Sequence, residues 1–92
     1  MYFVTTVDSK DEDTRCVGYF TTFKRAEKAV LDNACDIWET CYDYAVIENI
    51  DEGLYQYDQN AVWYKWNDLD EKYVRIEGRP EQYKNQVGFS IG

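Results

Sequence analysis

One stretch of this sequence has the spacing of an amphipathic helix, and runs of β-branched and aromatic residues lie on both sides of it. Apolar residues recur at intervals of three and four over residues 23–41, and Thr21 or Thr22 offers an N-cap. Asn33 is a candidate helix stop, because asparagine tolerates the left-handed conformation that often ends a helix. The helix therefore either continues through residues 36–42 or ends near Asn33 and is followed by a separate turn.

The runs on either side of the helix predict strands. Residues 2–7 and 16–20 precede it and flank a charged loop, which indicates an antiparallel hairpin. After the helix, residues 44–50 alternate, and the segments 61–66 and 72–77 flank a five-residue hairpin loop. A short run at residues 86–91 is a candidate for one more strand. The order β-β-α-β-β-β predicts an α+β fold of two layers, an antiparallel sheet of about five strands with one helix across one face.

Length and composition limit the chain to one domain, residues 1–92. A chain of this size buries only about 60 to 65% of its unfolded surface, which argues against a large internal active-site cavity. No segment approaches the roughly 18 consecutive apolar residues of a membrane span, and the N-terminus lacks a basic-then-apolar signal. We therefore expect a cytoplasmic protein that does not bind membranes.

The charge of this chain restricts its partners. The formal net charge is -8 and the isoelectric point is near 4.3. Direct binding to nucleic acid or to an anionic membrane needs a basic field. We therefore expect a basic partner, and no direct contact with nucleic acid.

The residue types present argue against catalysis and cofactors. The sequence has no histidine, the side chain most often used for proton transfer and zinc binding near neutral pH. Cys35 and Cys41 are six residues apart and lack the further ligands of a zinc site. No phosphate-binding glycine loop or nucleophile motif is found. We expect a protein that is not an enzyme and that holds neither a metal nor a cofactor.

The charges on the predicted helix are ordered against its dipole. Bases stand in its first half and acids follow, whereas a helix prefers acids at its N-terminus. If the helix is unbroken, the acids span about 16 Å on one face and could imitate part of a phosphate backbone. The alternative is a solvated face on which Lys28 pairs with Asp32. The four acids are Asp32, Asp36, Glu39 and Asp43.

Aromatic residues, 17% of the chain, supply the second set of candidate binding residues. On a strand, Trp63 faces one side while Tyr64 and Trp66 face the other. Exposed tryptophan and tyrosine are enriched at the energetic centres of protein interfaces, but all three residues are equally consistent with the core. Tyr55 follows a turn and is expected to be exposed. We therefore take Tyr55, Trp63 and Trp66 as candidate partner-binding residues.

Several short runs between Val17 and Trp66 carry a resemblance to known proteins: Gly18, Tyr19, Phe20, Thr22, Phe23, Ala26, Glu27, Ala29, Val30, Tyr44, Ala45, Val46, Ile47, Glu48, Glu52, Gly53, Leu54, Tyr55, Trp63, Tyr64, Lys65 and Trp66. In these residues the sequence resembles short proteins of unknown function encoded by Gram-positive bacteria and their phages. The resemblance implies a mobile-element context, in which small acidic proteins often act by binding a host protein. It implies no enzymatic activity.

These observations favour a small inhibitor or adaptor of phage type, with an anti-defence role like that of an anti-CRISPR protein. It would mimic nucleic acid and occupy a basic surface of a host nucleic-acid-handling protein. One alternative is a protein that sequesters a nucleotide-like small molecule, with Arg75, Arg79 or Lys84 on its phosphates. Another is a housekeeping interaction module. The sequence leaves the target and the oligomeric state open.

Overall fold

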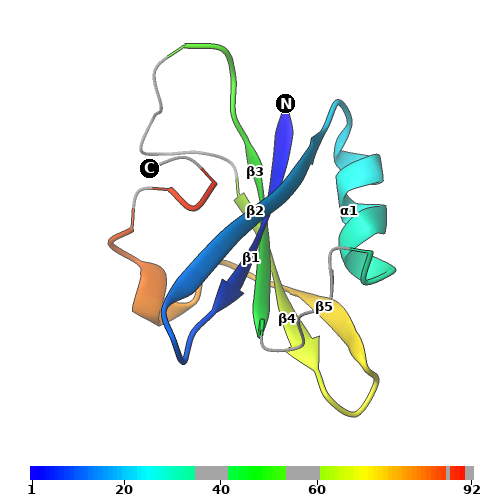
Figure 1. Ribbon diagram of the computed structural model, residues 1–92, viewed down its shortest axis with the longest axis vertical. Helices are drawn as coiled ribbons and strands as arrows, with labels where there is room; N and C mark the ends of the chain where they lie inside the picture. Colours follow the sequence, from blue (N-terminus) through cyan, green and yellow to red (C-terminus); the bar gives the residue numbers. More distant parts are fainter. Residues whose placement is uncertain (35–41, 54–60, 87, 91–92) are drawn as a thin grey trace.

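The computed structural model describes residues 1–34, 42–53, 61–86 and 88–90. They form one five-stranded sheet in the order β2-β1-β3-β4-β5, in which every neighbouring pair is antiparallel. Figure 1 shows α1 against one face of this sheet and the C-terminal segment against the other. Within the described residues, no helix has the length and apolar character needed to cross a membrane. The elements are β1 (Tyr2–Asp8), β2 (Asp13–Phe20), α1 (Phe23–Leu31), β3 (Tyr44–Asn49), β4 (Ala61–Asn67), β5 (Lys72–Ile76) and the 3-10 helix η1 (Glu81–Tyr83).

The predicted α+β class, with one helix and a five-stranded antiparallel sheet, is confirmed. The strand β2 begins earlier than expected, at Asp13, because its polar first half pairs through its backbone with the end of β1 and needs no buried side chains. Thr22 caps α1 and accepts a hydrogen bond from the Arg25 amide. The helix ends at Leu31, and Asn33 adopts the left-handed conformation with φ 55°. The earlier of the two expected helix ends is therefore the observed one.

The face of the sheet beneath α1 carries the larger core cluster. Ala26 and Val30 of the helix are fully buried against it. Alternation along each strand places every second side chain on this face, so the strands contribute one residue in two. The buried strand residues of this helix-side core are Val4, Ala45, Ile47, Tyr64 and Tyr73.

The opposite face is covered by the described residues 79–86 and 88–90, which we call the C-terminal strap. Trp63 lies beneath the strap with 1% of its surface exposed, and the rings of Tyr83 and Phe89 pack on it. The described part of residues 86–91 forms no strand, which corrects the expectation of a sixth strand. Apolar alternation suits an extended segment lying on a sheet face as well as it suits a paired strand.

Candidate functional site

The two hairpin loops of the sheet have the same local construction. In the β1–β2 loop, the Asp8 carboxylate accepts hydrogen bonds from the amides of Lys10, at 3.0 Å, and Asp11, at 3.4 Å. In the β4–β5 loop, the Asn67 side chain accepts from the amides two and three residues later, at 2.9 and 3.2 Å. Each loop then ends on a glutamate with positive φ, Glu12 or Glu71. Such side-chain turns fix the loop backbone and leave the other acidic side chains free to face water.

Both loops lie at the same end of the sheet (Figure 1), because β1 and β4 run in the same direction on either side of β3. Asp43 joins them. Its carboxylate accepts hydrogen bonds from the Ser9 amide, at 2.9 Å, and from the Ser9 hydroxyl, and its carbonyl accepts from the Trp66 amide at 2.9 Å. The loop centres are three strand spacings apart, or roughly 14 Å.

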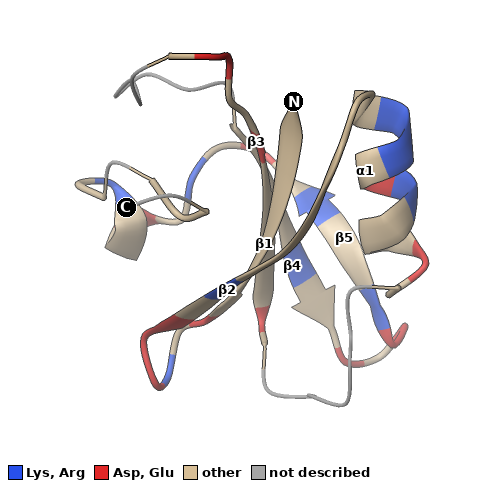
Figure 2. Ribbon diagram, turned by 45° about the horizontal axis from the view of Figure 1, so that its top comes forward, with Lys and Arg blue, Asp and Glu red and all other residues tan. Residues whose placement is uncertain are grey.

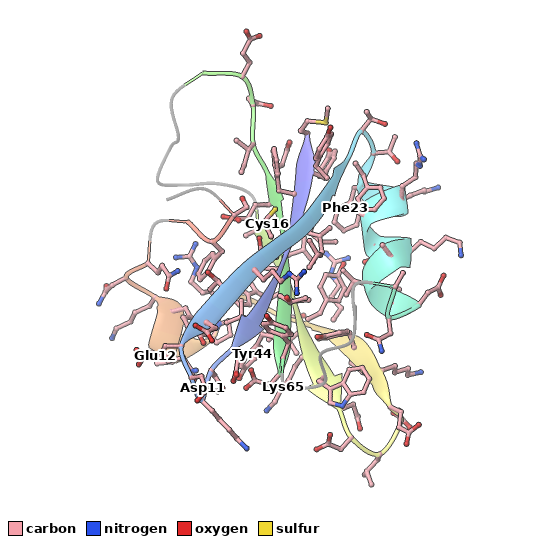
Figure 3. The ribbon with its side chains drawn as sticks, viewed as in Figure 1. Asp11, Glu12, Cys16, Phe23, Tyr44 and Lys65 are labelled. Carbon is pink, nitrogen blue, oxygen red and sulfur yellow. The ribbon has the colours of Figure 1, made fainter. Side chains whose placement is uncertain are left out.

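This end of the molecule gathers exposed carboxylates. Figure 2 shows red acidic segments in both loops, and Figure 3 shows Asp11 and Glu12 at the tip of the β1–β2 hairpin. Lys10, Lys65 and Lys72 lie in or next to the same loops, so acids outnumber bases there. Within the described residues, no ion pair involves these carboxylates. We call the following exposed residues the acidic end: Asp11, Glu12, Asp13, Asp68, Asp70 and Glu71.

The condition for a row of four acids, one unbroken helix, is not met, because α1 ends at Leu31. Asp32 is the C-cap residue and pairs with Lys28 at 2.6 Å, the arrangement of the solvated-face alternative. This hydrogen bond raises the pKa of the Lys28 amine. Asp43 lies before β3 and belongs to the loop-joining contacts. Asp36 and Glu39 lie outside the described residues.

The predicted orientation of the strand β4 aromatics is observed. Trp63 faces the strap, whereas Tyr64 and Trp66 face the helix side, where Trp66 packs edge-on to Tyr73 with ring centroids 5.1 Å apart. Trp63 is buried and Trp66 is half-buried, so both act as packing residues in this structure. Tyr55 lies outside the described residues.

The bases nominated for a nucleotide site all have partners within the chain. Arg75 lies 3.8 Å from Glu27 and over the Phe23 ring, and Lys84 pairs with Glu81 at 3.1 Å. Arg79 donates hydrogen bonds to backbone carbonyls within the strap. An open cavity of about 540 Å³ at the far end of β4 and β5 includes Arg75 in its lining but neither of the other two. These contacts do not favour the nucleotide alternative.

Sequence reasoning missed Glu48, a carboxylate in the middle of β3 that is 1% exposed. Its oxygens accept hydrogen bonds from the backbone amides of Phe89, at 3.3 Å, and Ser90, at 3.0 Å. The sequence signal for it is an acidic residue inside the apolar run of the predicted strand 44–50. An acidic side chain on the buried face of a strand needs buried hydrogen-bond donors. Glu48 therefore holds the strap against the sheet.

The described residues contain no group of three or more potential metal ligands, and Cys16 carries an exposed free thiol on β2. Comparisons with protein-family models, with curated proteins and with solved structures found no match to this chain. The arrangement of the described side chains is therefore the basis for any functional conclusion.

Proposed function

We propose that this protein is a small, non-enzymatic inhibitor or adaptor that binds a basic, nucleic-acid-binding surface of a host protein. The observation that supports this proposal is the acidic end, where two hairpins of a single sheet present exposed carboxylates on fixed loops. Charge complementarity of this kind speeds association with basic surfaces and excludes acidic ones.

The geometry of the acidic end is suited to imitating nucleic acid. The two loops are separated by roughly 14 Å. The major groove of B-DNA, which separates two phosphate chains, has a similar width of about 12 Å. Asp43 and the hydrogen-bonded turns hold the loops in place, so little ordering entropy is lost when a partner binds. The sequence resemblance implies a mobile-element context, and a phage-type, anti-defence role is part of this proposal.

A matched pair of charge variants tests the proposal. Asp68→Asn with Asp70→Asn removes two charges from the acidic end, whereas Asp51→Asn with Glu52→Gln removes two exposed charges from the opposite end of β3. Each purified protein is added to a panel of bacterial DNA-binding nucleases, including CRISPR effectors, and DNA binding by the nuclease is measured. We expect the wild type and the opposite-end variant to inhibit at least one nuclease, and the acidic-end variant to bind it more slowly, most strongly at low salt.

In the same measurement, duplex DNA should compete with this protein for the nuclease. Inhibition that DNA does not relieve, or that both variants lose to the same extent, would contradict an acidic nucleic-acid mimic.

A further inference from the structure

The strap is attached to the sheet mainly by side chains. Within the described residues, its backbone hydrogen bonds stay inside the strap, apart from the two amides that donate to the Glu48 carboxylate. The rest of the attachment is apolar and aromatic. Phe89 clusters with Val7 and Val46 and meets Trp63 edge-on at 4.9 Å. Tyr83 stacks on Trp63 at 5.6 Å and lies edge-on to Tyr44 at 6.2 Å. The strap thus lies on the face as a bound peptide would, held by the Glu48 carboxylate and by packing around Trp63.

The strap also leaves buried polar atoms without partners. On the sheet side, the Thr5 hydroxyl and the Trp63 indole nitrogen have no hydrogen-bond partner, although these residues are 0% and 1% exposed. On the strap side, the Ser90 hydroxyl is also unpartnered. Such atoms lower the stability of the contact, because each has lost its water without gaining a replacement. The strap is therefore an imperfect match for the face that it covers.

The polar groups of the sheet side lie close together on that face. The strand register places Thr5 opposite Val46 and Val46 opposite Trp63, so Thr5 and Trp63 belong to one row across β1, β3 and β4. Glu48 is two residues beyond Val46 on β3 and therefore points to the same side. We call the residues Thr5, Glu48 and Trp63 the strap-binding face.

We propose that the strap-binding face is a docking site for an extended segment of a partner protein, and that the strap occupies this site until the partner displaces it. The segment would carry an aromatic residue against Trp63, successive backbone amides on Glu48, and polar side chains that pair with Thr5 and the Trp63 nitrogen. A basic segment is favoured by the charge of -8 on this chain. The strap of a second copy is less favoured as the occupant of this face, because it would leave the same polar atoms without hydrogen-bond partners. This inference is independent of the acidic end.

Arg79 allows the strap to be weakened without altering the docking site. Its guanidinium donates to the carbonyls of Tyr83, at 3.3 Å, and Gln86, at 2.6 Å, and lies 5.5 Å from the centroid of the Phe89 ring. All of these partners belong to the strap. Arg79→Ala should therefore raise the fraction of molecules in which the strap is released, and a competing peptide should bind more tightly in proportion.

The probe is a fluorescein-labelled synthetic peptide with the sequence of residues 79–90, added to the full-length protein and followed by fluorescence anisotropy. We expect weak binding to the wild type and roughly tenfold tighter binding to Arg79→Ala, the effect of losing hydrogen bonds to a charged group. Arg75→Ala, which removes an arginine on the helix side, should behave as the wild type. A probe with Phe89→Ala, and one with a methylated Ser90 amide nitrogen, should each bind more weakly. A probe with Glu81→Lys should bind more tightly at low salt.

Circular dichroism shows whether each variant is folded, and light scattering measures its oligomeric state. An Arg79→Ala protein that is folded and monomeric but binds the probe no better than the wild type overturns the proposal. A folded Arg79→Ala protein that forms a dimer, which the probe dissociates, also overturns it, because the occupant is then a second copy. Equal binding of the parent, Phe89→Ala and amide-methylated probes would show that the contact with Trp63 and Glu48 is not the docking site.

Discussion

The hydroxyl of Tyr64, in the centre of the sheet, donates a hydrogen bond of 2.6 Å to the Glu27 carboxylate of α1. Tyr64 is fully buried, and the Arg75 guanidinium lies 3.8 Å from the same Glu27 oxygen. The helix is short and buries only Ala26 and Val30 completely, so this polar contact is a substantial part of what fixes it to the sheet.

Removal of the Tyr64 hydroxyl should therefore destabilise the protein. We expect Tyr64→Phe to lower the free energy of unfolding by about 1.5 to 3 kcal/mol, the usual contribution of a hydrogen bond to a charged group. Urea unfolding followed by circular dichroism measures the change. Tyr19→Phe is the matched control, because Tyr19 is 63% exposed. An equal loss in the two variants would contradict the role given to the Tyr64–Glu27 bond.

The free energy of unfolding should also fall at alkaline pH, in part through the Tyr64 hydroxyl. Burial of the Tyr64 hydroxyl, its hydrogen bond to Glu27 and the negative charge of Glu27 all raise the pKa of Tyr64, and burial also raises the pKa of Tyr83. Because the folded protein keeps these phenol protons to higher pH than the unfolded chain, the stabilisation is complete below about pH 10 and is lost as the pH rises further.

Unfolding measured in urea at several pH values between about 8.5 and 11.5 checks this prediction. We expect the stability of Tyr64→Phe to fall less steeply above pH 10 than that of the wild type, and the stability of Tyr19→Phe to follow the wild type. Parallel curves for all three proteins would show that Tyr64 is not a source of the alkaline loss.

The two tryptophans of β4 should differ in their effect on stability. Trp63 is 1% exposed between the sheet and the strap, so Trp63→Ala should cost about 3 to 5 kcal/mol, a large share of the total stability of a small domain. Trp66 is half-buried, and Trp66→Ala should cost less. Denaturant unfolding of both variants measures the difference. A larger loss for Trp66 would mean that the helix-side core depends on it more than its burial indicates.

The sequence was sufficient to predict the fold because the local patterns agree with each other. Four of the five strands have observed bounds within one residue of the predicted ones, since β-branched and aromatic runs end at turn residues such as Asn67 and Gly53. Thr22 and Asn33 marked the helix ends through their capping conformations.

The candidate site was harder to predict, because its parts are distant in the sequence. Asp11 and Asp70 share one end only because β1 and β4 run in the same direction in the sheet, which no local pattern specifies. The contact between Glu48 and the amide of Ser90 joins residues 42 positions apart. An isolated glutamate in a strand is normally assigned to the solvent side, and only the folded strap supplies the donors that allow its burial.

Asp43 provides a last test, which separates structure from binding. Its carboxylate accepts hydrogen bonds from the amide and the hydroxyl of Ser9, and its own amide donates to the Val7 carbonyl at 3.0 Å. Asp43→Ala should therefore lower the free energy of unfolding by about 2 kcal/mol, whereas Asp11→Ala, at an exposed position of the same loop, should change it by less than about 0.5 kcal/mol. Thermal and urea unfolding compare the two. If Asp43→Ala were as stable as the wild type, the two hairpin loops would not depend on this contact for their arrangement, and the fixed spacing of the acidic end would need another explanation.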